Sequence, residues 1–135
     1  MVSSKTTIRI RYADTDQMKF VYNGKYLEFF EVGRTELIRE MGMSYKEFED
    51  AGFMLPLNDA YIKYHSPAFY DEVLEIESRL ETKPMARLQI DYTIRVGERV
   101  IATGYTRHAF LSVETGKPVR SPGIFNELIE KYFKE

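Results

Sequence analysis

The chain has 135 residues, of which 44% are hydrophobic and 30% are charged, and its net charge is -2. This length fits one domain with a hydrophobic core, and no apolar run reaches the roughly 20 residues that cross a bilayer. We therefore expect a single soluble domain over residues 1–135, located in the cytoplasm. The absence of cysteine excludes disulfide frameworks, thiolate metal sites and cysteine nucleophiles, and the dispersed, nearly balanced charge argues against a nucleic-acid partner.

The first half of the chain predicts one strand and two helices. Apolar and basic residues alternate from Thr7 to Tyr12, which is typical of a half-buried strand, and a polar loop follows over residues 13–22. Apolar residues at three- and four-residue steps then predict a long helix over residues 25–41, ended by Gly42. Ser44 and Glu47 form a capping-box pattern for a short helix over residues 45–51.

The second half predicts four strands and a closing helix. Alternating apolar residues indicate strands over residues 60–64, 74–80, 88–96 and 99–113. Gly97-Glu98 separates the last two strands as a two-residue hairpin signal, so these strands should pair antiparallel. Ser121 and Pro122 predict the N-cap and first position of a helix whose apolar side holds Ile124, Phe125, Leu128, Ile129 and Tyr132.

This order predicts an α+β protein in which a five-stranded antiparallel sheet wraps around one long helix, with short additional helices. One helix on one such sheet leaves strand edges and apolar surface uncovered. Because a second identical chain would cover both, we expect a homo-oligomer.

The loop before the long helix is the best place for chemistry. Unpaired N–H groups and the positive end of the helix dipole can stabilise an oxyanion there, and Asp16 lies a few residues upstream as a possible nucleophile or general base. Alternatively, Asp14, Thr15 and Asp16 only hydrogen-bond their own turn. On spacing alone, this structural interpretation is favoured.

Other residues have weaker claims on function. Tyr22 could line a pocket, although packing beside the helix start is the commoner role. Glu31 and Arg34 should pair with each other on the helix. Two histidines, His65 and His108, make a poor metal site, so no metal is expected. Three basic residues near strand ends could meet phosphate groups or simply be solvated: Lys83, Arg87 and Arg107.

Longer motifs resemble a known family. Residues 12–16, Tyr-Ala-Asp-Thr-Asp, followed by Val-Tyr-Asn-Gly-Lys-Tyr-Leu-Glu-Phe-Phe-Glu over residues 21–31, look like the signature of the hot-dog acyl-CoA thioesterases. The likeness extends to Gly33-Arg34 and to residues 64–68 and 114–118, and the branch is similar to 4-hydroxybenzoyl-CoA and Tol-Pal-cluster thioesterases.

This resemblance implies a function and a site. It implies hydrolysis of an acyl-CoA thioester at the interface of a homodimer or homotetramer with a continuous sheet, and no separate cofactor, since coenzyme A is part of the substrate. Asp16 would be the catalytic carboxylate, and the N–H of Asn23 would polarise the thioester carbonyl. Lys83, Arg87 and Arg107 would then be candidates for binding the CoA phosphates.

Two departures from the family pattern keep alternatives open. Lys19 stands where the family usually has glycine, so its side chain could restrict the loop's approach to a substrate. Asn23 stands where many members have histidine; it cannot carry a proton, and a structural N-cap role is favoured. The alternatives are a non-catalytic acyl-CoA binding module, or a hydratase, which would need an Asp–His pair although no histidine lies near Asp16 in sequence.

Overall fold

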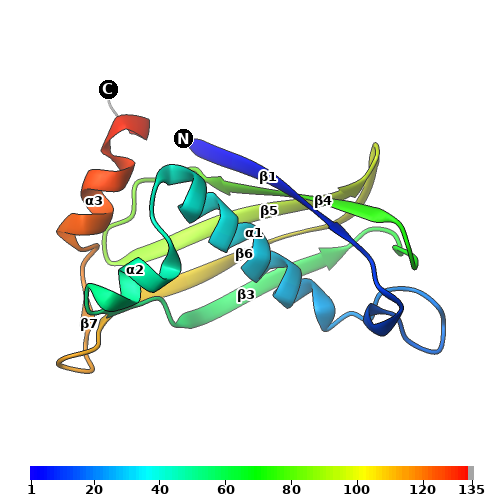
Figure 1. Cartoon of the computed structure of the whole chain (residues 1–135), viewed down its shortest axis with the longest axis horizontal. Coiled ribbons are helices and arrows are strands. Elements are labelled where there is room, and N and C mark those ends of the chain that lie inside the picture. Colours follow the sequence, from blue (N-terminus) through cyan, green and yellow to red (C-terminus); the bar gives the residue numbers. More distant parts are fainter. Residues whose placement is uncertain (134–135) are drawn as a thin grey trace.

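A computed structural model describes residues 1–133 as an antiparallel sheet with one long helix lying across one face (Figure 1). The strands are β1 Val2–Arg9, β2 Phe53–Met54, β3 Leu57–Tyr64, β4 Val73–Leu80, β5 Arg87–Val96, β6 Arg99–Ser112 and β7 Pro118–Val119. The helices are α1 Lys25–Met41, α2 Tyr45–Asp50 and α3 Gly123–Ile129, with 3₁₀ turns at Tyr12–Asp14 and Glu130–Tyr132. The strand order is β1-β4-β5-β6, and β2, β3 and β7 also pair with β6.

The helix α1 packs on β1, β4 and β5 through its apolar side. Gly33 permits this close approach, because a Cβ there would lie 2.7 Å from the Ile76 Cγ2 atom of β4 and would also meet Ser78. Gly42 ends the helix in the left-handed region, with φ 118°, as predicted for that glycine. Phe30 stacks on Tyr92 of β5 with ring centroids 4.2 Å apart, which fixes the helix over the middle of the sheet.

Several predicted elements are confirmed. The capping box of Ser44 and Glu47 is present, and α2 begins at Tyr45. The strands β5 and β6 form an antiparallel hairpin in which Val96 pairs with Arg99, and Gly97 has the positive φ of 59° that the turn requires.

Three predictions about element bounds are wrong. The first strand runs from Val2 to Arg9 rather than over residues 7–12. Its start was not predicted because the polar residues Ser4 and Thr6 occupy inward positions, so apolar and polar residues do not alternate there. The sheet has seven strands instead of five, since the two-residue β2 and β7 are too short for a period. The N-cap of α3 is Pro122, one residue after the predicted Ser121.

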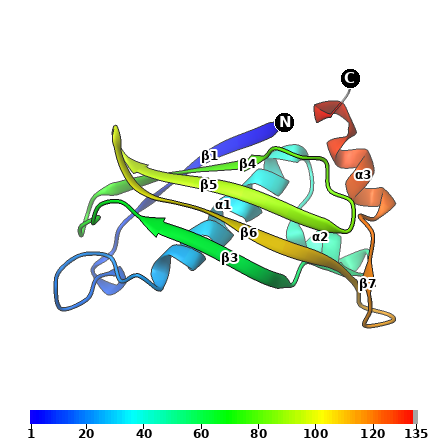
Figure 2. The same ribbon diagram turned by 180° about the vertical axis from the view of Figure 1, so that it is seen from behind.

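The edge of β3 is open. This strand pairs with β6 on one side, and each of its residues except the half-buried Ile62 is exposed. Figure 2 shows β3 as the lowest long strand, and Tyr64 at its end reaches the start of α1. On its other side β3 pairs with no strand of the described residues. No helix of the described residues has the length and apolar character needed to cross a membrane.

Candidate active site

The loop before α1 folds back on itself as a small hairpin. The Tyr22 N–H donates to the Asp14 carbonyl, Thr15 pairs with Val21, and the Asp16 N–H donates to the Phe20 carbonyl at 3.1 Å. Facing residues of a hairpin place their side chains on one side. Asp16 and Phe20 therefore share a side of this hairpin.

Asp14 is the buried carboxylate of the loop, with 3% exposure. One oxygen accepts the Arg11 backbone N–H at 2.9 Å, and the other lies 3.2 Å from the Arg11 guanidinium and 3.7 Å from the Lys25 ammonium group. Burial alone would raise the pKa of Asp14, but these hydrogen bonds and charges outweigh it and hold the pKa below the ordinary 3.8. Asp14 therefore anchors the loop to the first turn of α1.

Asp16 is half-buried and makes fewer bonds. Its Oδ1 accepts the Met18 N–H at 2.8 Å, and its carbonyl accepts the Lys19 N–H at 2.9 Å. No ion pair holds its carboxylate among residues 1–133, so its second oxygen is available for chemistry. Lys19 has φ 70°, a left-handed conformation that glycine adopts freely, which gives a physical reason for glycine at this position in the family pattern.

The N-terminus of α1 presents free donors. Its N-cap is Gly24, and within residues 1–133 no side chain caps the helix, so the N-cap role predicted for Asn23 is wrong. The N–H groups of Asn23 and Gly24 donate to no acceptor in the described chain. The Tyr64 hydroxyl donates to the Asn23 carbonyl at 3.0 Å and so ties this turn to the end of β3.

A groove of about 380 Å³ opens beside these donors. Its walls come from the loop, from α1, from the end of β3 and from the chain just after it. They comprise Phe20, Val21, Asn23, Tyr26, Tyr64, His65, Ser66 and Pro67. Burial and the neighbouring Tyr64 raise the pKa of Tyr26 to about 12, so its phenol is neutral at neutral pH. The groove can accept an apolar group whose carbonyl meets the free N–H groups.

Sequence reasoning missed the β3 side of this groove. Tyr64 and His65 lie more than 40 positions from Asn23. The family likeness over residues 64–68 was the available signal, but no site role was predicted from it, and the pairing of β3 with β6 brings these residues to the groove. The His65 ring is held by Nε2, 2.8 Å from the Thr103 hydroxyl on β6. Tyr22, in contrast, is 58% exposed and its ring lies over Gly24, so it is outside both the core and this groove.

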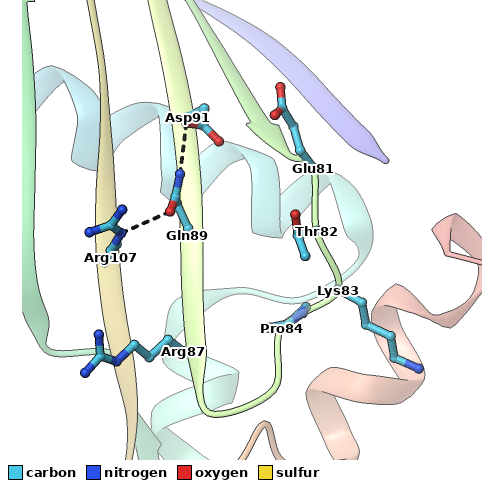
Figure 3. Close-up of a pocket in the computed structure, with 8 residues that line it drawn as sticks. All are labelled: Glu81, Thr82, Lys83, Pro84, Arg87, Gln89, Asp91 and Arg107. Atoms are coloured by element: carbon cyan, nitrogen blue, oxygen red, sulfur yellow. Dashed lines mark hydrogen bonds between the residues drawn. The ribbon is translucent and has the colours of Figure 1, made fainter.

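The predicted phosphate-binding residues line one hollow of about 350 Å³ on the outer face of the sheet (Figure 3). Arg107 donates to Gln89 and pairs with Asp59 at 3.2 Å, while Lys83 points away from the other side chains. The hollow lies at the Val2–Leu80 end of the β1–β4 pair, and the Asp16 loop follows the Arg9–Val73 end. Within one chain the two sites are therefore a strand length apart.

The other singled-out residues do not join the Asp16 loop. Glu31 and Arg34 form no ion pair in the described chain, so that predicted pairing is wrong. Arg34 donates instead to the Tyr92 hydroxyl, 3.3 Å away. His108 is fully buried, and burial together with the charge of Arg34 lowers its pKa to about 4. Among residues 1–133, no three His, Asp or Glu side chains gather as a metal site would require.

Known proteins of similar sequence and fold point to one family. A family model for the thioesterase-like superfamily matches residues 10–130. The chain is 34% identical over 133 residues to the putative acyl-CoA thioesterase YneP of Bacillus subtilis, with 97% of this chain and 96% of that protein covered. It also matches the structure of a DHNA-CoA thioesterase from Staphylococcus aureus with a TM-score of 0.91 and 31% identity, over 98% of this chain and 91% of that one.

Proposed function

Because the chain belongs to the thioesterase-like superfamily, we propose that it hydrolyses an acyl-CoA thioester to a free acid and coenzyme A. The observation that carries the proposal is the position of the Asp16 hairpin beside an α1 N-terminus with two free N–H groups. A carboxylate near preorganised donors is the arrangement that acyl transfer needs.

The thioester carbonyl lies against the N–H groups of Asn23 and Gly24, and these donors stabilise the oxyanion as it forms. Asp16 either attacks the carbonyl carbon or takes a proton from the attacking water. The acyl group occupies the groove between Tyr26 and Tyr64. Asp14 positions the loop and does not touch the substrate, since its oxygens are already bonded to Arg11 and Lys25.

We also propose that two copies pair through the open edge of β3, as a homodimer or as the dimer within a homotetramer. Leu57, Tyr61 and Tyr64 are each about half exposed on this strand, although large apolar side chains favour burial. A two-fold axis makes the pairing antiparallel, so Tyr64 of one chain meets the Leu57 end of the other.

This pairing would bring the hollow that contains Arg87 and Arg107 close to the Asp16 loop of the other chain. Arg107 is paired with Asp59, near the start of β3, and that end of the partner lies beside the Asp16 loop in the proposed dimer. The partner's Arg87 and the partner's Arg107 are then the candidates for the CoA phosphates. Within a single chain the same residues are at the wrong end of the sheet.

A thiol-release assay with a panel of acyl-CoA thioesters tests the function. We expect release of CoA with turnover that saturates with substrate. Tight binding without release would replace the proposal with a binding module, and addition of water to an enoyl-CoA would replace it with a hydratase.

The dimer is tested on the β3 edge. The Tyr61 carbonyl faces Gly104 of β6, so the N–H groups of the adjacent residues Ala60 and Ile62 face the open edge. Ala60→Pro removes one of these donors without removing a β3–β6 bond, and we expect dissociation in light scattering together with loss of turnover. Lys63→Ala, on the same strand, is the control. A monomeric variant with parental turnover would contradict a shared site.

A further inference from the structure

Arg34 is a half-buried cation with no carboxylate within 4.0 Å in the described chain. Its guanidinium has five N–H donors, and the one hydrogen bond it makes, to the Tyr92 hydroxyl, is long at 3.3 Å. Burying a charge without a counterion is costly, and a protein commonly retains such a charge for a ligand.

The groups on the sheet side of Arg34 are neutral. The Tyr92 hydroxyl bonds to the Thr106 hydroxyl at 2.7 Å, and Thr106 in turn bonds to Nε2 of His108 at 2.9 Å. Burial raises the pKa of Tyr92 and, with Arg34, lowers that of His108, so both side chains are uncharged at neutral pH. This network holds the guanidinium in place without a counterion, and Glu31, which lines the same crevice, makes no ion pair with it in the described chain.

Arg34 also lines a small crevice of about 110 Å³, whose other walls are Glu31, Thr35, Ile38, Tyr45 and Leu55. Since one water in the liquid takes about 30 Å³, the crevice has room for a few heavy atoms and not for a second large ligand. It is therefore suited to the end of a chain.

The crevice and the groove beside Asn23 lie on the same side of α1. Asn23, Tyr26, Arg34 and Ile38 follow one another at steps that keep one side of the helix. Eleven residues separate Asn23 from Arg34, which is roughly 16 Å along a helix. An extended acyl chain of that length spans the distance from Asn23 to the crevice.

We propose that Arg34 is a specificity-determining residue that binds an oxygen at the far end of the acyl chain, so that the preferred substrates are acyl-CoA thioesters with a terminal carboxylate or hydroxyl group. This inference rests on the proposed thioesterase function. Arg34 donates to the terminal oxygen, and the Thr35 hydroxyl at the same crevice is a second partner. Glu31 at the rim can accept a hydrogen bond from a terminal hydroxyl but repels a terminal carboxylate. Comparing substrates with the two kinds of terminus therefore shows how much Glu31 affects binding.

The test compares dodecanoyl-CoA with its ω-hydroxy and ω-carboxy analogues, using the parent and the Arg34→Gln and Arg34→Leu variants. We expect the parent to prefer the oxygen-bearing thioesters. Loss of a hydrogen bond from a charged donor should lower kcat/KM for them roughly ten- to hundred-fold and leave dodecanoyl-CoA within about three-fold. Arg39→Gln, on the same helix but exposed and paired with Glu36, should change none of these values.

Each failure has its own signature. Release of CoA from none of the acyl-CoA panel by the parent would refute the thioesterase proposal itself, whereas release from other members of the panel but from none of these three thioesters would overturn the role of Arg34 alone. Hydrolysis of all three by the parent without preference, or a preference that Arg34→Gln leaves intact, would overturn the role of Arg34 alone. If Arg34→Leu fails to fold, the role of Arg34 is decided by the substrate preference of the parent and of Arg34→Gln. The glutamine can still donate to Tyr92.

Discussion

The two turns of the loop before α1 each contain an aspartate, but they use it differently. In the first turn, Asp14 is buried and bonded to Arg11 and Lys25. In the second turn, Asp16 is half-buried and accepts one backbone N–H. The first carboxylate therefore stabilises the native structure, while the second retains an oxygen that no side chain of residues 1–133 occupies.

This difference shows how one short segment separates stability from chemistry. A carboxylate that satisfies cations cannot also attack a carbonyl without breaking those bonds. By fixing the loop through Asp14, the chain leaves Asp16 held but unpaired beside the helix N-terminus. A substitution at Asp16 should therefore lower turnover, and a substitution at Asp14 should lower stability.

The largest expected effect is on turnover in Asp16→Asn. Asparagine keeps an acceptor for the Met18 N–H but removes the negative charge. Loss of a general base lowers kcat by roughly a hundred- to ten-thousand-fold, and loss of a nucleophile lowers it further. Steady-state hydrolysis of acyl-CoA measures this effect, and the Kd of a non-hydrolysable CoA thioether should stay within a few-fold of the parent.

Asp14→Asn should give the opposite result. The amide presents an NH₂ group to donors that now face a carboxylate oxygen, so we expect a loss of about 1–3 kcal/mol in the free energy of unfolding. Urea denaturation measures it. At temperatures where the variant is folded, it should keep most of the parental kcat. A variant that lost turnover but kept parental stability would reverse the roles that we assign to the two aspartates.

Acid should weaken the same anchor. The folded pKa of Asp14 lies below 3.8, so its contribution to stability is complete above 3.8 and is lost as pH falls through the folded pKa. The stability difference between the parent and Asp14→Asn should therefore be constant near neutral pH and should shrink below pH 3.8. A difference that stayed constant down to acid unfolding would show that Asp14 does not act through its charge.

Much of the fold followed from local patterns in the sequence. The period of α1, the capping box of α2 and the hairpin at Gly97 are each determined by residues close together, and each prediction was confirmed. The start of β1 was missed because Ser4, a polar residue, is buried at an inward position of the strand. Its position depends on pairing with β4, which local patterns do not encode.

The site was predictable only on the side that lies within one segment. Asp16 and Asn23 belong to a single loop, whereas Tyr64 and His65 reach the groove through long-range strand pairing. The roles of Asp14 and Asp16 could not be separated from their spacing, because the difference depends on which carboxylate Arg11 and Lys25 contact. The burial of Arg34 beside Tyr92 likewise arises from the packing of α1 on the sheet.

The smallest expected effect is that of Lys19→Gly in the second turn. Lys19 has φ 70°, where a side chain costs about 1 kcal/mol relative to glycine, so removing the Cβ should raise the free energy of unfolding by at most that amount. Lys19→Ala is the matched control, because it removes the ammonium group but keeps the Cβ. We expect stability to rise in the glycine variant alone, and KM or acyl preference to change modestly as the loop comes closer to the substrate. Equal stability of the glycine and alanine variants would show that this turn is not strained, and unchanged kinetics across the acyl-CoA panel would show that Lys19 points away from the site.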